Sequence, residues 1–191
     1  MFQVRIHGRG GQGVVTAAEL LSVAAFAEGT HAQAFPSFGS ERTGAPLAAF
    51  CRLSDRPIRT REPVVSPDCV IIQDATLLDH DGVLGGLQPG GYVLVNSADP
   101  APLPAAHGDA VVIAVPATEL ALRHIGRPVP NAALLGGFAA LTGRLRLASV
   151  LRAIRERFPL RLADGNVAAA REAYELVRRE SRAQQEEFSR A

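Results

Sequence analysis

Short apolar runs alternate along the chain with longer segments in which apolar residues recur at helical spacing. The short runs predict strands at Phe2–His7, His31–Phe35, Leu47–Leu53, Cys69–Gln73, Tyr92–Val95 and Ala110–Val115. The longer segments predict helices at Val14–Glu28, Leu77–Leu87 (interrupted by Gly82), Ala117–Ile125, Asn131–Leu141, Leu147–Phe158 and Asn166–Glu187. Strands and helices therefore alternate over most of the chain.

This alternation is typical of the α/β class. We expect a Rossmann-like, mostly parallel sheet with helices on both faces, and the C-terminal helices packed on it. A length of 191 residues suits a single domain, so we expect residues 1–191 to form one. The highly charged end, residues 180–191, is expected to fray or to contact a partner.

A glycine-rich segment follows the first predicted strand and opens the first predicted helix. Gly8, Gly10 and Gly13 fit the pattern GxGxxG in the context that this pattern requires. Such a turn leaves the N–H groups of a helix N-terminus accessible to a phosphate or carboxylate. A tight strand-to-helix turn that binds nothing would have the same glycines, so the segment alone leaves both interpretations open.

A nicotinamide cofactor is disfavoured at this turn. Dinucleotide-binding domains place an Asp or Glu about 20 residues further on, at the end of the second strand, to hold the ribose. That stretch here is His31–Phe35, and Glu28 comes too early. Gln12 stands instead at the first turn of the helix, where its amide can both donate and accept hydrogen bonds without carrying charge.

Composition excludes several kinds of chemistry. All 20 basic side chains are arginine, so the chain has no lysine for a Schiff base or a phosphate loop of the GxxxxGK[ST] type. Two cysteines, Cys51 and Cys69, are too few for an iron–sulfur cluster, and no zinc-binding spacing exists. The net charge is +1, and no run of basic residues interleaved with aromatic residues occurs, which argues against nucleic-acid binding. No apolar run is long enough for a membrane span, and we expect a cytoplasmic protein.

Several motifs occur in the order found in one enzyme family. The segment His7–Val14 resembles the GxGGQG signature of the gamma subunit, or gamma domain, of 2-oxoacid:ferredoxin oxidoreductases, which include the pyruvate, 2-oxoglutarate, 2-oxoisovalerate, indolepyruvate and phenylglyoxylate enzymes. Further segments that resemble this family are Phe38–Gly44, Leu53–Ile58, Pro67–Ile71, Gly90–Ser97, Ala117–Ala121, Asn131 with Leu135 and Gly136, and Asn166. The resemblance covers roughly residues 2–175. One departure is Thr43, where the family often has glycine.

The resemblance implies that this chain is one part of a complex. The family oxidatively decarboxylates a 2-oxoacid to an acyl-CoA and passes the electrons to ferredoxin, or to NAD through a flavoprotein subunit. Thiamine diphosphate, magnesium and 4Fe–4S clusters would belong to partner subunits of the alpha, beta and delta types. This gamma subunit would hold no metal and no catalytic residue, would assemble the complex, and would help to form the coenzyme A site.

The candidate coenzyme A site combines the glycine turn with the following loop. Its residues are Gly8, Gly10, Gly11, Gln12, Gly13, Ser37, Phe38, Gly39, Ser40 and Arg42. The turn would supply N–H groups, the hydroxyls would donate hydrogen bonds, and Arg42 would supply a bidentate cation for a phosphate. An ion pair with Glu41 or a subunit contact would explain Arg42 equally well.

Other polar residues near the expected ligand edge have structural explanations. His7 is expected to be half-buried and bonded to backbone, or else to carry protons. Asp74, Asn131 and Asn166 are expected to cap helices. Two alternatives to the coenzyme A subunit stay open: a stand-alone nucleotide-binding Rossmann oxidoreductase, and a purely structural module without a ligand.

Overall fold

The computed structural model describes residues 1–37, 45–80, 82–99 and 108–188. It contains strands β1 (Phe2–Arg9), β2 (His31–Pro36), β3 (Pro46–Ser54), β4 (Cys69–Ile72), β5 (Tyr92–Asn96) and β6 (Val111–Val115). The helices are α1 (Val14–Phe26), α2 (Ala117–Ile125), α3 (Asn131–Thr142), α4 (Leu147–Arg157) and α5 (Leu160–Phe188), with a short 3-10 helix, η1 (Ala75–Asp79). The expected strands are all present in this part of the chain.

The strands form one mixed sheet in the order β2-β3-β1-β4-β5-β6. Strands β1, β4, β5 and β6 are parallel neighbours, whereas β3 runs antiparallel to both β1 and β2. Only β3 therefore opposes the common direction, and the expectation of a mostly parallel α/β sheet is confirmed. The carboxyl ends of five strands lie along one edge.

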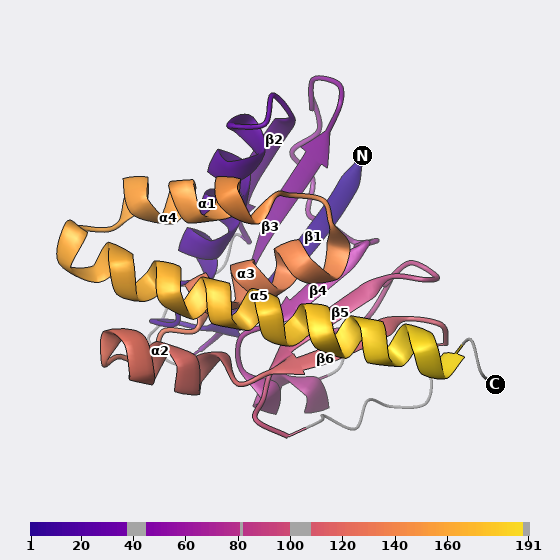
Figure 1. Ribbon diagram of the computed structural model, residues 1–191. Coiled ribbons are helices and arrows are strands. Elements are labelled where there is room, and N and C mark those ends of the chain that lie inside the picture. Colours follow the sequence, from indigo (N-terminus) through magenta and orange to yellow (C-terminus); the bar gives the residue numbers. More distant parts are fainter. Residues whose placement is uncertain (38–44, 81, 100–107, 189–191) are drawn as a thin grey trace.

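The two faces of the sheet are covered unequally. All five α-helices pack into one apolar cluster with side chains such as Ile6, Ile71 and Leu94 from one face. Figure 1 shows these helices in front of the sheet, with α4 packed on α1, α3 and α5, and we call the five helices together the helix layer. The opposite face packs Val70, Val93 and their neighbours against η1 and the turns after it. In the described structure, the five α-helices therefore cover one face of the sheet. The second face is covered by the short 3-10 helix η1 and by turns.

Two buried arginines hold loops against the β1–β3 part of that second face. The guanidinium of Arg5 donates to the carbonyls of Val64 (3.3 Å), Val83 (2.9 Å) and Gly85 (2.6 Å). Arg52 is 2% exposed and donates to the side chains of Gln3 and Gln33 and to the Glu62 carbonyl. Desolvation by burial lowers the pKa of both arginines.

Two expected helices have other limits. The prediction of a helix over Leu77–Leu87 is wrong. In this region the described residues form only the short 3-10 helix Ala75–Asp79, and the chain then turns. Gly82 and Gly86 have φ of 87° and 74°, conformations that do not continue a right-handed helix. The last helix begins at Leu160, so Asn166 lies inside it and is not a cap; its side chain donates to the Leu162 carbonyl.

Candidate ligand site at the carboxyl edge of the sheet

The glycine turn joins the end of β1 to α1 at the carboxyl edge. Gly13 is the residue before α1, and its left-handed backbone (φ 75°) turns the chain into the helix. Gly8 has no room for a side chain, since a Cβ there would lie 2.5 Å from Val14 Cγ2. The N–H groups of Gly10 and Gln12 donate to the carbonyls of Ala45 and Arg9. Those of Gly11 and Gly13 have no acceptor among the described residues.

Gln12 locks the turn to the next parallel strand. Its Oε1 accepts from the Arg9 N–H at 2.7 Å, and its Nε2 donates to Asp74 Oδ2 at 3.1 Å. Arg9 Nε also donates to Asp74 Oδ2 at 3.1 Å. Both amide atoms of Gln12 thus have partners within the chain, which makes this side chain a brace for the turn in the structure described here.

Asp74 serves this network and also caps η1. Its Oδ1 accepts from the N–H (3.1 Å) and the hydroxyl (2.6 Å) of Thr76, so the expected capping role is confirmed. Burial raises the pKa of Asp74, but hydrogen bonds from Thr76 and Gln12 and the charge of Arg9 outweigh burial and leave that pKa lowered. The carboxylate stays ionised and is matched by Arg9.

Gln73 is a buried polar residue whose side chain has no partner. It follows β4 and is 0% exposed, and both Nε2 and Oε1 lack a hydrogen bond in the described structure. Its backbone is fully used: the N–H donates to the His7 carbonyl, and the carbonyl accepts from Asn96 Nδ2 at 2.8 Å. A fully buried, unbonded amide costs about 1–3 kcal/mol. The amide of Gln73 therefore has unused hydrogen-bonding capacity. It lies beside the glycine turn, because a Cβ added to Gly8 would be 3.2 Å from the Cβ of Gln73.

The N-termini of three α-helices meet at this edge. Asn96 caps α2, because its Oδ1 accepts from the Thr118 N–H at 3.0 Å. Asn131 is the first residue of α3 and follows Pro130. A Cβ on Gly13 would lie 2.6 Å from Asn131 Nδ2, so the start of α3 closely approaches the start of α1. Aligned helix N-termini carry partial positive charge and favour an anion.

The structure brings part of the predicted site together. Gly8 lies near the end of β1, and Gly10, Gly11, Gln12 and Gly13 form the turn that follows it. Ser37 lies at the same edge after β2, with its N–H donating to the Ala48 carbonyl at 2.8 Å. Phe38, Gly39, Ser40 and Arg42 lie outside the described residues. Ligand binding by any of these ten residues stays a prediction.

His7 is held in its neutral form. Burial and the nearby charge of Arg5 lower the pKa of His7 to about 4. Its Nε2 is buried and has no hydrogen-bond partner in the part of the chain that the structure describes. The expected backbone bond is therefore absent at Nε2, and this pKa does not suit a proton carrier near neutral pH.

The two cysteines are buried, and the titratable groups of the described residues form no cluster suited to a metal. Cys51 and Cys69 are free and fully buried, and burial raises the pKa of the Cys51 thiol to about 12. No group of three or more His, Cys, Asp or Glu side chains in the described ranges could hold a metal ion. Within the same ranges, no helix has the length and apolar character needed to cross a membrane.

Sequence reasoning missed Gln73, Asn96 and the close approach of Asn131 to Gly13. A signal existed for the first two, because each follows a buried apolar strand and such positions fall at the carboxyl edge of a parallel sheet. No local signal could place Asn131 against Gly13, since the contact depends on how α3 packs beside α1.

Comparison with known proteins identifies the family. Residues 3–176 match the family described as pyruvate ferredoxin/flavodoxin oxidoreductase. The chain is 46% identical to pyruvate synthase subunit PorC of Methanothermobacter marburgensis, over 93% of this chain and 98% of that protein. It is 45% identical to the pyruvate/ketoisovalerate oxidoreductases common subunit gamma of Thermococcus kodakarensis, over 91% and 96% of the two chains.

A solved structure agrees with these sequence relatives. The crystal structure of pyruvate oxidoreductase subunit PORC from Thermotoga maritima superposes with a TM-score of 0.78 at 36% identity, covering 91% of this chain and 95% of that chain. Sequence and fold thus agree over nearly the whole length of both proteins. The chain belongs to the pyruvate ferredoxin/flavodoxin oxidoreductase family and is a gamma subunit of the 2-oxoacid:ferredoxin oxidoreductase type.

Proposed function

We propose that this gamma subunit helps to form the coenzyme A site of a complex that converts a 2-oxoacid to an acyl-CoA. In that reaction one 2-oxoacid, one coenzyme A thiol and two oxidised ferredoxins give the acyl-CoA, carbon dioxide, two reduced ferredoxins and one proton. Relatives named for pyruvate and ketoisovalerate support short 2-oxoacids as substrates. Both of these relatives are named as subunits of larger enzymes, so they give no support to the alternative of a stand-alone nucleotide-binding oxidoreductase.

The reactive groups would belong to other subunits. Thiamine diphosphate with magnesium supplies the carbanion chemistry of decarboxylation, and 4Fe–4S clusters carry the electrons. We assign these groups to alpha-, beta- and delta-type partners, and the acceptor to ferredoxin or, through a flavoprotein subunit, to NAD. The two buried cysteines of this chain are consistent with that division, because burial keeps their thiols protonated.

The single observation that carries the coenzyme A proposal is the unbonded amide of Gln73 beside the glycine turn. Coenzyme A offers phosphates and amides, which pair with N–H donors and with an amide side chain. The N–H groups of Gly11 and Gly13, which have no acceptor among the described residues, lie at the same edge as the N-termini of α1 and α3. The described residues therefore fit a polar or phosphate-bearing part of this ligand.

The substitution Gln73→Leu tests the proposal through two effects of opposite sign. Replacing an unbonded buried amide by an apolar group of similar size should leave the free energy of unfolding unchanged or raise it by about 1 kcal/mol. The same change should weaken coenzyme A binding to the assembled complex about tenfold, since one hydrogen-bonding group is lost. Denaturant titration of the chain and calorimetric titration of the complex with coenzyme A measure the two effects.

A matched control is Gln88→Leu, which changes a glutamine outside the carboxyl edge. It should alter neither coenzyme A affinity nor assembly. Equal coenzyme A affinity for Gln73→Leu and Gln88→Leu would argue for a structural module without a ligand contact. That alternative also expects Gly11→Ala to disturb assembly while leaving coenzyme A affinity intact. Gly11 has φ 94°, which strains an alanine backbone, although the space around its Cβ position is open.

A further inference from the structure

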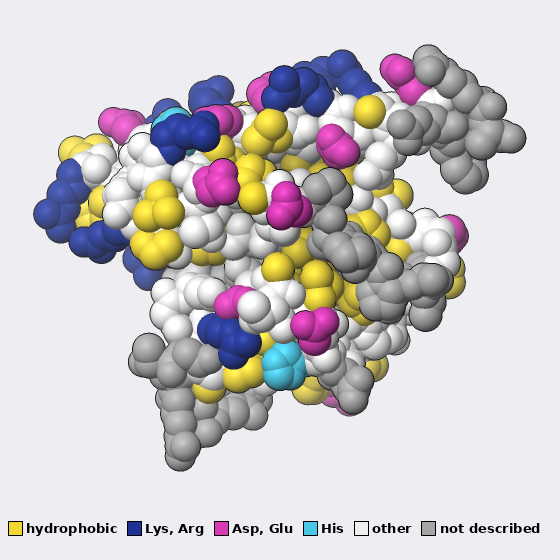
Figure 2. Space-filling view, turned by 90° about the horizontal axis from the view of Figure 1, so that it is seen from below, with side chains coloured by type: hydrophobic (Ala, Val, Ile, Leu, Met, Phe, Trp, Pro, Cys, Tyr) yellow, Lys and Arg dark blue, Asp and Glu magenta, His cyan; other side chains and the backbone are white. Residues whose placement is uncertain are grey.

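The charges of this chain are distributed very unevenly. Residues 144–182 contain ten of the 20 arginines but only five of the 19 acidic residues. The rest of the sequence has ten arginines and 14 acidic residues, so it carries the opposite net charge. The basic stretch comprises α4, most of α5 and the connection from α3, which belong to the helix layer. Figure 2 shows dark-blue side chains gathered along the upper rim and the left end of the molecule.

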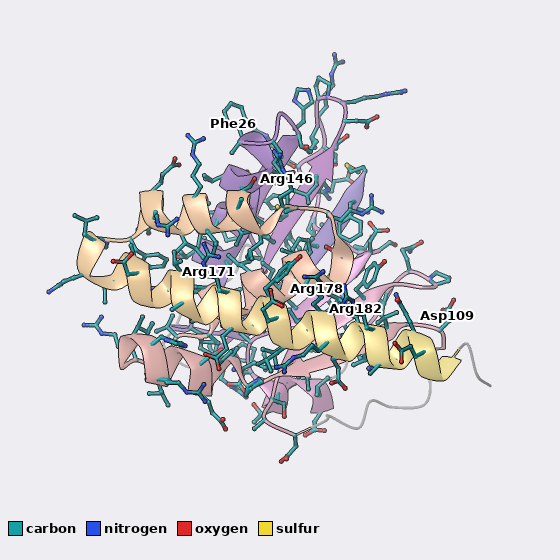
Figure 3. All side chains as sticks on the ribbon, viewed as in Figure 1. Phe26, Asp109, Arg146, Arg171, Arg178 and Arg182 are labelled. Atoms are coloured by element: carbon teal, nitrogen blue, oxygen red, sulfur yellow. The ribbon has the colours of Figure 1, made fainter. Side chains whose placement is uncertain are left out.

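Three of these arginines form a stripe on α5, which we call the α5 arginine stripe: Arg171, Arg178 and Arg182. Their spacing of about two helical turns and then one turn places them on the same side of the helix, over about 16 Å. All three are exposed, whereas Ala170 and Val177 on the other side of α5 are buried. Figure 3 shows the stripe running along α5 in the helix layer.

The described part of the chain does not neutralise the stripe. Within the described ranges, no carboxylate lies within 4.0 Å of the three guanidinium groups. Glu175 lies between Arg171 and Arg178 on the helix and removes only part of the positive charge. Glu172 is engaged on the side facing α2, where it binds Arg123 and His124. The stripe therefore presents unpaired cations.

Three classes of occupant can be compared by charge. A second copy of this chain would oppose stripe to stripe in a two-fold contact centred there, which places like charges together. Nucleic acid is disfavoured by the overall charge of +1 and by the acidic residues between the arginines. An acidic face of a different protein supplies carboxylates, with which arginine forms bidentate pairs, and arginine is enriched at protein interfaces.

We propose that the α5 arginine stripe docks an acidic surface of a partner subunit in the oxidoreductase complex. This inference rests on the assembly part of the proposed function and does not involve coenzyme A. The stripe would steer the encounter through charge and fix the register of α5 on its partner. Binding through this surface should weaken with increasing ionic strength, because exposed charges are screened by salt.

The test reverses the charge of the stripe in the full chain and measures its association with the other subunits. The variant carries Arg171→Glu, Arg178→Glu and Arg182→Glu, and the matched control carries Arg56→Glu, Arg59→Glu and Arg61→Glu, three exposed arginines outside the helix layer. At low ionic strength we expect the stripe variant to associate more than about 100-fold more weakly, and the control to stay within about threefold of the unmodified chain.

A second variant guards against loss of folding. Replacing the same three arginines by glutamine removes their charge without adding repulsion inside α5, and it should lower the salt dependence of association. Unfolding midpoints of the isolated chains identify any variant that has not folded. The measurements are made without coenzyme A, so a failed coenzyme A proposal cannot change their result.

Three results would overturn the inference. The first is equal association of the stripe variant and the control. The second is an unchanged salt dependence in the glutamine variant. The third is a dimer of the isolated chain that the stripe variant abolishes, which would make a second copy the occupant.

Discussion

The contact between Gly13 and Asn131 allows a quantitative test of how the glycine turn is built. Gly13 has φ 75°, and a Cβ added there would lie 2.6 Å from Asn131 Nδ2. In Gly13→Ala the left-handed backbone should cost about 1–2 kcal/mol, and the overpacking against a buried side chain should add about 1–3 kcal/mol. Reduced freedom of the unfolded chain offsets about 0.4–1 kcal/mol. We therefore expect a loss of about 2–4 kcal/mol in the free energy of unfolding, measured by urea titration.

Two further variants separate backbone strain from the steric contact. Gly143 has φ 61° with nothing within 4 Å of its Cβ position, so Gly143→Ala should cost only about 1 kcal/mol. Asn131→Ala removes Nδ2 and leaves the Asn131 Cβ, which lies 3.7 Å from the added Cβ, an ordinary contact distance. In that background Gly13→Ala should cost no more than Gly143→Ala does. The reasoning is refuted if Gly13→Ala is as mild as Gly143→Ala, or if Asn131→Ala does not relieve its penalty.

Two other predictions concern the second face of the sheet. Because the pKa of His7 is lowered to about 4 from an ordinary 6.5, the unfolded chain binds the proton more tightly. The contribution of neutral His7 to the free energy of unfolding is therefore fully present above pH 6.5 and is lost as the pH falls towards 4, by up to about 3 kcal/mol. His7→Gln should reduce this dependence of the free energy of unfolding on pH, as measured by urea titrations at several pH values. An equally steep slope in His7→Gln would assign it to another group. Arg5→Met leaves the carbonyls of Val64, Val83 and Gly85 without a donor, so trypsin should cut faster at Arg59 and Arg61 in the loop that Arg5 holds. Cleavage at the unmodified rate would show that Arg5 does not hold that loop.

The coarse fold could be predicted because it depends on local patterns. Apolar runs fixed the positions of the strands, and helical spacing located α1, α2, α3 and α4 to within a few residues. The turn from Gly8 to Gly13 was found because its glycines are required locally, by a left-handed conformation at Gly13 and a close approach at Gly8. The family could be inferred from motifs that follow one another along the chain.

The limits of η1 and α5 were harder to predict for a physical reason. The stretch Leu77–Leu87 has enough leucine to suggest a helix, but Gly82 and Gly86 adopt positive φ. After η1 its apolar side chains Val83 and Leu84 are buried on the second face of the sheet without helical geometry. Helix α5 begins at Leu160, before Asn166, and Ala163 in its first turns is buried in the core. The sequence pattern, which suggests a cap at Asn166, does not reveal this burial.

The sequence by itself determined the α/β class, the glycine-rich turn after β1 and the membership in this oxidoreductase family. Only the tertiary structure decided that all five α-helices share one face and that Gln12 braces the turn to Asp74. It also decided that the side chain of Gln73 is buried without a hydrogen bond to the described residues. Residues such as Gly13 and Asn131 are distant in the chain, and their contact arises from the packing of α1 against α3. Periodicity reports which side of one element is apolar, whereas the packing of separate elements decides which polar atoms meet a partner and which do not.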